Sequence, residues 1–196
     1  MENRSVILAI VAPSGAGKST LINYLLDNYP DIFQRYPTVT SRTIRPGETQ
    51  GNPYIFVTQE KIEQMLLDGD FLEFERKPYN NCVYGKTKSV LSTLDPKKIL
   101  LTEEQIVQVK DLKENLPNYG VYSIYIHIPD LEVMKQRLIA RGDDPESIEI
   151  RIKTAYEEEV ESRHLADFII PSVQGHVEKS ADMVLDILKN TIGVKI

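Results

Sequence analysis

Val6-Ile-Leu-Ala-Ile-Val11 is an unbroken apolar run, and Ala12-Pro-Ser-Gly-Ala-Gly-Lys-Ser-Thr20 follows it at once. A strand with one face in water would alternate apolar and polar residues. The run therefore predicts a central parallel strand that is covered on both faces. Apolar residues then recur at helical spacing, at Leu21, Ile22, Leu25 and Leu26. The chain thus places a glycine-rich turn between a buried strand and a helix.

This turn has the chemistry of a phosphate-binding loop. Backbone N–H groups of such a turn, together with the positive end of the helix dipole, attract an anion. Lys18 would bridge phosphates, and the Ser19 hydroxyl would bind Mg²⁺. The residues expected to hold a nucleotide are Pro13, Ser14, Gly15, Ala16, Gly17, Lys18, Ser19 and Thr20. The alternative is that Gly15 and Gly17 merely close a strand-to-helix turn.

The pattern G-x-x-x-x-G-K-[ST] begins here with Ala12 instead of glycine. If the backbone at this position needs a positive φ, alanine costs about 1 kcal/mol of strain. If glycine serves only for close approach of the backbone, the methyl group of Ala12 fits. The sequence leaves both alternatives open.

The composition favours an ordinary globular protein. With 196 residues, 41% of them hydrophobic, the chain is expected to form one compact domain with small inserted lobes. Its net charge of −6 argues against a general basic field for nucleic acid. Cys82 is the only cysteine, which fits a reducing cytoplasm, and no apolar run approaches the length of a membrane span. We therefore expect a cytoplasmic protein that binds neither nucleic acid nor membranes, and its protein partners are not predictable.

The stretch 38–90 has short strands and many turns, which predicts a lobe inserted between core units. Arg42 and Arg45 lie three residues apart beside a Pro-Gly turn, so they could converge on one anion, or they could be ordinary surface arginines of a solvated loop. Strand 71–75 alternates and should place Leu72 and Phe74 on one face, opposite Glu73 and Glu75. A strand at 54–57, a helix at 59–67, a turn-rich stretch at 78–85 and a helix from 86 or 87 to 94 complete this lobe.

Strands and helices alternate in the rest of the chain. Strands are expected at 98–101, 121–128 and 168–170, and helices at 103–114, 131–141, from 146 onward and at 177–189. This order predicts βαβ units and a parallel sheet. His127 is expected to be a strand residue near the end of the sheet rather than a catalytic residue.

Three arginines surround a turn that interrupts the helical pattern. Arg137 and Arg141 share one helix face, residues 142–145 break the helix, and Arg151 follows on the next helix. This arrangement suits a lid that closes over phosphates. It equally suits a charged helical hairpin in which the arginines pair with Asp143, Asp144 and Glu149.

These pieces, in this order, resemble guanylate kinases, which pass the γ-phosphoryl of ATP to GMP. The segment R-x-x-R-P-G-E at 42–48 carries most weight, because a phosphate-binding loop alone indicates only a nucleoside triphosphate. The matching stretches are 13–20, 40–56, 71–73, 84–85, 137–142 and Arg151. The resemblance implies a P-loop NTPase fold with a three-layer α/β core, 1–37 and 91–196, an inserted α+β GMP-binding lobe, 38–90, and a helical lid, 137–156.

The resemblance also implies ATP and Mg²⁺ as cofactors, GMP or dGMP as acceptor, and roles for individual residues. Lys18, Arg42, Arg137, Arg141 and Arg151 would serve catalysis. Arg42, Arg45, Tyr54 and Tyr84 would hold the GMP phosphate, and Glu73 and Glu103 would read guanine near Thr38. The implied GMP-binding set is Thr38, Arg42, Arg45, Glu48, Tyr54, Glu73, Tyr84, Thr87 and Glu103.

The chemistry of the bases supports this assignment. Guanine presents N–H donors beside its O6 acceptor, so one ionised carboxylate can accept two hydrogen bonds. Adenine offers an acceptor nitrogen there, which would leave the carboxylate unpaired. An unpaired buried acceptor costs about 1–3 kcal/mol, which favours guanine strongly. Phosphoryl transfer needs mainly positioning and neutralised charge, which Lys18, Ser19 and the arginines supply.

Several positions depart from the family pattern. Ala12 replaces a glycine, Leu101 replaces the first acid of a D-x-D pattern, and Lys86 stands where a hydroxyl is usual. Pro171-Ser172 replaces N-D, and two extra residues separate Glu73 from Tyr84. We therefore expect slower turnover or looser base choice than is typical of the family.

Two other functions remain open at this stage. One is a related P-loop kinase with a different monophosphate acceptor. The other is a guanylate-kinase-like module of low activity that binds a phosphorylated ligand. A GTPase is disfavoured, because the chain has neither an N-K-x-D nor a D-x-x-G motif.

Overall fold

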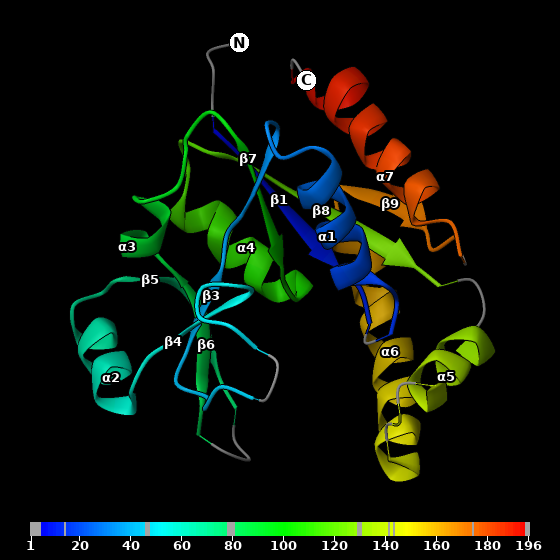
Figure 1. Ribbon diagram of the computed structural model, residues 1–196, viewed down its shortest axis with the longest axis horizontal. Helices are drawn as coiled ribbons and strands as arrows, with labels where there is room; N and C mark the ends of the chain where they lie inside the picture. The colour runs from blue at the N-terminus through cyan, green and yellow to red at the C-terminus, as the bar shows by residue number, and fades with distance from the viewer. Residues whose placement is uncertain are drawn as a thin grey trace.

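The larger sheet has five parallel strands in the order β2-β7-β1-β8-β9, which confirms the predicted parallel core (Figure 1). The computed structural model describes residues 5–13, 15–45, 48–77, 81–128, 131–140, 142, 144–173 and 175–194. The strands are β1 (Val6–Val11), β2 (Phe33–Arg35), β7 (Ile99–Glu103), β8 (Gly120–His127) and β9 (Phe168–Pro171). The central strand, β1, pairs with β7 on one side and β8 on the other.

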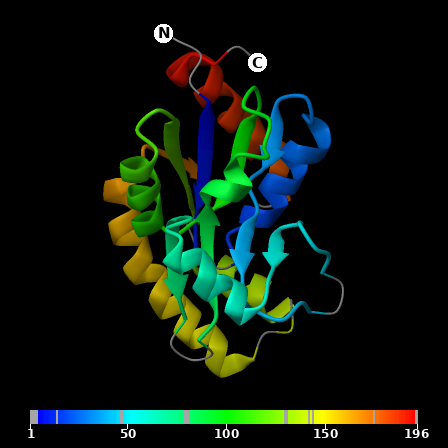
Figure 2. The same cartoon turned by 90° about the vertical axis from the view of Figure 1, so that its left-hand side faces the viewer.

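Helices cover both faces of this sheet, so the core has three layers, seen from the side in Figure 2. Helices α1 (Lys18–Asn28) and α7 (Val177–Asp186) pack on one face, and α7 continues as the π-helical turn Ile187–Ile192. Helices α4 (Ile106–Asn115) and α6 (Pro145–Leu165) contact the other face. Every residue of β1 is buried, as its unbroken apolar run predicts, because each face meets a helical layer.

A second, four-stranded sheet follows the order β4-β3-β6-β5. It has a small core of its own around Val39, Ile62, Met65 and Val83. In Figure 1 this sheet and α5 lie at the end of the molecule where β1 and β8 finish, away from both chain termini. The strands and helices of this part of the chain are β3 (Thr38–Thr40), β4 (Tyr54–Phe56), α2 (Gln59–Leu67), β5 (Phe71–Arg76), β6 (Val83–Thr87) and α3 (Lys88–Leu91). Helix α5 spans Leu131–Ala140 and follows β8 of the core.

Strand β6 was not predicted. The sequence indicated turns up to residue 85 and a helix from 86 or 87 to 94, whereas the structure has a strand that pairs with both β3 and β5, and α3 spans only Lys88–Leu91. The sequence does not indicate this strand at Gly85 and Lys86, because glycine and lysine both have a low propensity for strands. Gly85 is needed because a Cβ there would collide with the backbone oxygen of Glu73. Helix α4 also begins later than predicted, at Ile106, because β7 continues to Glu103.

Strand β5 does not alternate as predicted. The register with β6 shifts between Phe71 and Glu73, which is the signature of a β-bulge. As a result Leu72 and Glu73 are both buried, whereas Phe74 is 48% exposed. The bulge therefore turns the carboxylate of Glu73 inward, and the prediction that Phe74 shares the buried face with Leu72 is wrong.

Within the described residues, no helix combines the length and the apolar character needed to cross a bilayer.

Gly85→Ala should destabilise the protein by at least about 2 kcal/mol, because the new methyl group meets the Glu73 backbone oxygen and the Phe71 ring. Urea unfolding of the two proteins measures this loss. Gly120→Ala is the matched control, since its Cβ would meet only the movable Tyr122 ring at 3.0 Å. Equal losses in both variants would show that the close approach at β6 is not a constraint.

Candidate functional site

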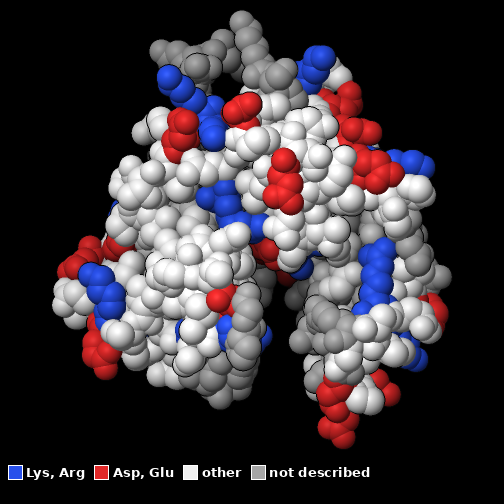
Figure 3. All heavy atoms as spheres, in the orientation of Figure 1, with Lys and Arg blue, Asp and Glu red and all other residues white. Residues whose placement is uncertain are grey.

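Two adjoining cavities open where the strands of the parallel sheet end. One, of about 720 Å³, surrounds the turn after β1, and the other, of about 590 Å³, lies between that turn and the second sheet. Lys18 and Glu103 line both cavities, so a ligand in one would lie beside a ligand in the other. Figure 3 shows the molecule hollowed between the part with the second sheet and the part with α5 and α6.

The turn after β1 has the geometry of a phosphate-binding loop. Gly15 and Gly17 have φ of +84° and +98°, a region that favours glycine. Asn81 is the one non-glycine residue with a positive φ in the described part of the chain. Ala12 therefore occupies the first position of the pattern without left-handed strain, which decides between the two alternatives for that residue. Lys18 Nζ donates to the carbonyl oxygens of Ala12 and Pro13, the latter at 3.3 Å.

Arg137 joins α5 to this turn. Its guanidinium is 3.3 Å from the Gly15 carbonyl oxygen, 3.4 Å from that of Ala16 and 3.2 Å from Ser172 Oγ, at the end of β9. The arginine thus lines the larger cavity with Lys18. Arg141 and Ser14 lie outside the described residues. Arg151 lies in α6, but its side chain is also outside the described part.

The residues present fit a magnesium ion. Ser19 and Glu103 line the same cavity, and hydroxyl and carboxylate oxygens are the ligands that Mg²⁺ prefers. The described residues contain no cluster of three or more His, Cys, Asp or Glu side chains suited to a metal. Mg²⁺ in phosphoryl-transfer sites needs only one or two protein ligands, since phosphates and water supply the others. Thr20 is exposed beside Ser19 at the start of α1.

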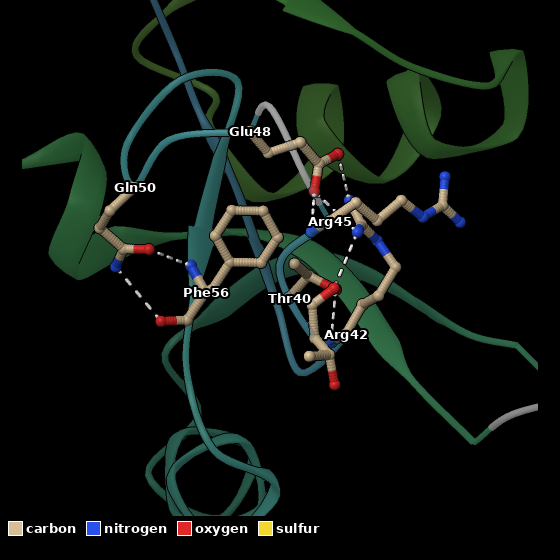
Figure 4. Close-up of polar contacts among 7 residues, drawn as sticks. Thr40, Arg42, Arg45, Glu48, Gln50 and Phe56 are labelled. Atoms are coloured by element: carbon tan, nitrogen blue, oxygen red, sulfur yellow. Dashed lines mark hydrogen bonds and ion pairs between the residues drawn. The ribbon is translucent and has the colours of Figure 1, made fainter.

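The smaller cavity has an arginine at its outer end. Arg42 donates to both carboxylate oxygens of Glu48, at 2.9 and 2.8 Å, and its guanidinium lies 5.2 Å from the ring centres of Tyr54 and Phe56. The hydrogen bond from Arg42 and the backbone N–H of Arg45 lower the pKa of Glu48 to about 2. Figure 4 shows the Arg45 guanidinium turned away from Glu48.

The inner end of the smaller cavity is a buried charged network. Lys86, 1% exposed, donates to the Tyr36 carbonyl oxygen at 3.0 Å and to Thr38 Oγ1 at 2.6 Å. Its ammonium group is also 3.4 Å from a carboxylate oxygen of Glu104. Glu73 lies across from Lys86 in the β5–β6 register. Two carboxylates and one ammonium group are therefore removed from water together.

Burial dominates the electrostatics of these two carboxylates. Desolvation, with a smaller contribution from the charge of Glu104, raises the pKa of Glu73 to about 9, although Lys86 opposes the shift. Desolvation also raises the pKa of Glu104. Within the described residues, Glu73 Oε2 is buried and has no hydrogen-bond partner. A buried oxygen without a partner is rare in folded proteins, so we expect a ligand to donate a hydrogen bond to Glu73 Oε2.

The smaller cavity brings together most of the predicted acceptor residues. Its lining includes Thr38, Arg42, Arg45, Glu48, Tyr54, Glu73, Tyr84 and Glu103. Thr87 is not among them, because it is fully buried and its hydroxyl caps α3 at Val90 N.

Glu104 was missed by the sequence analysis. It follows the buried strand β7 directly after Glu103, and a pair of acids in that place is a usable signal. Glu104 lies in the buried network with Lys86, while Glu103 lies 4.0 Å from Arg35 and lines both cavities. His127 ends β8, as predicted, and its Nδ1 is 2.8 Å from Glu159 on α6.

Comparisons with known proteins agree with this geometry. Residues 2–191 match the family model described as guanylate kinase. A guanylate kinase of Clostridium perfringens is 41% identical over 159 residues, covering 80% of this chain and 71% of the relative. One of Helicobacter pylori is 34% identical, covering 98% and 90%. A crystal structure of guanylate kinase from Anaplasma phagocytophilum has the same fold, with a TM-score of 0.70, 22% identity and coverage of 100% and 99%. The chain belongs to the guanylate kinase family.

Proposed function

We propose that this protein transfers the γ-phosphoryl of ATP to GMP or dGMP, giving ADP and GDP or dGDP. The observation that carries the proposal is the buried Glu73 Oε2, which has no hydrogen-bond partner among the described residues, at the inner end of a cavity whose outer end holds Arg42 and Arg45. A ligand that suits both ends has N–H donors at one end and a phosphate at the other. A guanine nucleotide has both.

The base would bind at the inner end. In the ionised state Glu73 accepts hydrogen bonds from N1–H and the 2-amino group of guanine, which satisfies its buried oxygen. Adenine would place an acceptor nitrogen there and leave the ionised carboxylate unpaired, so the preference for guanine requires Glu73 to be ionised in the complex. Glu73 must release its proton to bind guanine, since its raised pKa leaves it protonated near neutral pH. Binding of guanine and release of the Glu73 proton are thereby linked.

The acceptor phosphate would bind at the outer end. Arg42, Arg45, Tyr54 and Tyr84 supply donors there, and Tyr54 and Tyr84 pack edge to face with ring centres 6.2 Å apart. Glu48 accepts hydrogen bonds from both terminal nitrogens of Arg42. The acceptor phosphate would therefore replace the Glu48 carboxylate on Arg42, or share the Arg42 guanidinium with it. In either case the guanidinium has an anionic partner before the phosphate binds.

Transfer would take place where the two cavities meet. ATP would lie on residues 13–20, with Lys18 and Arg137 neutralising the transferred phosphoryl, and Arg141 and Arg151 would complete the set. Ser19 would hold Mg²⁺, which supplies charge neutralisation between the phosphates when bound. Glu103, which the resemblance assigns to guanine, lines the same cavity as Ser19, and we assign it to the metal instead. We assign residues 38–90 to GMP binding, 1–37 and 91–196 to the core, and 137–156 to a lid. The proposal requires neither nucleic acid nor a membrane, and the single cysteine suits a cytoplasmic enzyme.

A substrate panel tests the proposal. Release of ADP is measured with Mg-ATP and each of GMP, dGMP, AMP, CMP and UMP. GMP and dGMP should be strongly preferred, because only guanine satisfies Glu73. If AMP served as well as GMP, the assignment of Glu73 to the base would be wrong.

Lys18→Ala should lower kcat at least about 100-fold and leave the Kd for GMP nearly unchanged, because Lys18 acts on the transferred phosphoryl rather than on the acceptor base. Steady-state kinetics and calorimetric titration with GMP give the two quantities. Lys110→Ala, an exposed lysine of α4, is the control for loss of a positive charge. A variant that loses GMP binding in proportion to turnover would contradict the assigned role.

Glu73→Gln should lower kcat/KM for GMP about 10- to 100-fold and narrow the preference over AMP. An amide presents N–H donors that oppose those of guanine, whereas it can pair with the amino group and N1 of adenine. Glu114→Gln, an exposed acid on α4, is the control. Unchanged selectivity in Glu73→Gln would count against the proposed base contact.

The same substitution should stabilise the ligand-free protein. Folded Glu73 keeps a proton between its usual pKa of 4.5 and about 9, whereas the unfolded chain releases it near 4.5. The free energy of unfolding of the wild type therefore falls as pH rises through this window. The Tm of Glu73→Gln should exceed that of the wild type at pH 8, and the difference should shrink toward pH 5. A variant that is less stable at pH 8 would show that Glu73 is not desolvated.

A further inference from the structure

Lys86 is a departure from the family pattern to which the proposed function gives no role, and it is buried at the inner end of the smaller cavity. An ammonium group has three N–H donors. Those of Lys86 face three oxygens, the Tyr36 carbonyl at 3.0 Å, Thr38 Oγ1 at 2.6 Å and Glu104 Oε1 at 3.4 Å. The side chain is 1% exposed, and all its donors have protein partners. Lys86 therefore acts on a ligand only through another residue.

Thr38 is the residue through which it can act. The Thr38 oxygen accepts the short hydrogen bond from Lys86, so its own hydrogen must point elsewhere. Within the described part of the chain, no protein oxygen accepts that hydrogen. Thr38 also lines the smaller cavity beside Glu73. Its hydroxyl hydrogen is therefore available to an acceptor at the inner end of that cavity, and one of the two lone pairs of its oxygen is already occupied by Lys86.

Glu104 offsets the electrostatic cost of burying the Lys86 ammonium group. A buried ammonium group needs a counter-charge, and Glu104 is the one that Lys86 contacts. Thr102 Oγ1 donates to the same carboxylate oxygen at 2.7 Å, which fixes its position at the end of β7. The network thus runs from Thr102 through Glu104 and Lys86 to Thr38. Glu104 and Thr38 both line the smaller cavity, and Thr38 is the one of the two that carries a hydroxyl hydrogen.

We propose that Lys86 is a positioning residue for base selection, which fixes the Thr38 hydroxyl as a hydrogen-bond donor to the carbonyl oxygen at C6 of guanine, with Glu104 as its counter-charge. The inference rests on the proposed function, since it takes guanine as the occupant. A threonine hydroxyl that rotates freely can donate or accept, so it tolerates a 6-oxo or a 6-amino group. A hydroxyl fixed as donor favours the 6-oxo group and opposes the 6-amino group.

The test compares GMP with its 6-thio analogue, which keeps N1–H and the 2-amino group and weakens only the acceptor at C6. Three proteins are compared with the wild type: Thr38→Val, the double variant Lys86→Met with Glu104→Gln, and the triple variant that combines all three changes. The double variant removes both buried charges, since Lys86→Met alone would leave Glu104 unpaired. Thermal unfolding establishes that each variant is folded.

The measured quantity is the ratio of kcat/KM for GMP to kcat/KM for the 6-thio analogue. Thr38→Val and the double variant should each lower this ratio about threefold to tenfold, the value of one hydrogen bond. The triple variant should lower it no further, because both changes remove the same contact. The double variant should also narrow the preference for GMP over AMP.

One result would overturn the inference while leaving the proposed function intact: a folded double variant that keeps the wild-type ratio. If that unchanged ratio came with an equal loss of kcat/KM for GMP and its 6-thio analogue, Lys86 would be a purely structural residue. A wild type that does not use GMP would overturn the proposed function itself and, with it, this inference.

Discussion

The burial of two carboxylates around one ammonium group is the constraint on which the site depends. Lys86 belongs to the second sheet, whereas Tyr36 precedes that sheet and Glu104 follows β7 of the parallel core. The network therefore joins the two sheets at the inner end of the smaller cavity. Charges removed from water need close partners, so the sheets must stay in register for the ions to be satisfied. Among the described residues, Glu73 Oε2 is left without a hydrogen-bond partner, and in the ionised state this oxygen can accept a hydrogen bond from a base.

The two ends of the smaller cavity follow different physical rules. At the outer end, Arg42 is paired with Glu48 on a loop, so its partner can be exchanged for a phosphate at modest cost. At the inner end, Glu73 and Lys86 are nearly inaccessible, so each unmatched polar atom costs much more. Affinity for a phosphate can therefore come from the outer end, where the partner of Arg42 can be exchanged, and choice of base from the inner end. The shared residues Lys18 and Glu103 then connect this cavity to the loop after β1.

Much of the core could be predicted because its signals are local. The apolar run of β1 and the glycines after it specify a buried strand, a tight turn and a helix, and the structure has all three. The second sheet was harder, because its determinants are contacts between distant residues. Gly85 and Lys86 are poor strand formers, yet the first is needed where β6 approaches Glu73 and the second is paired with Glu104. No periodicity reveals such a pairing, nor the bulge in β5 that turns Glu73 inward.

The protonation state of Glu73 should change when GMP binds. The carboxyl resonance of Glu73, identified by its loss in Glu73→Gln, can be followed by ¹³C NMR across pH with and without saturating GMP. We expect the carboxyl to be protonated at pH 7 in the free protein, because burial raises its pKa to about 9, and ionised at pH 7 when GMP is bound. A Glu73 that is already ionised at pH 7 without ligand, or whose pKa does not change when GMP binds, would contradict the account.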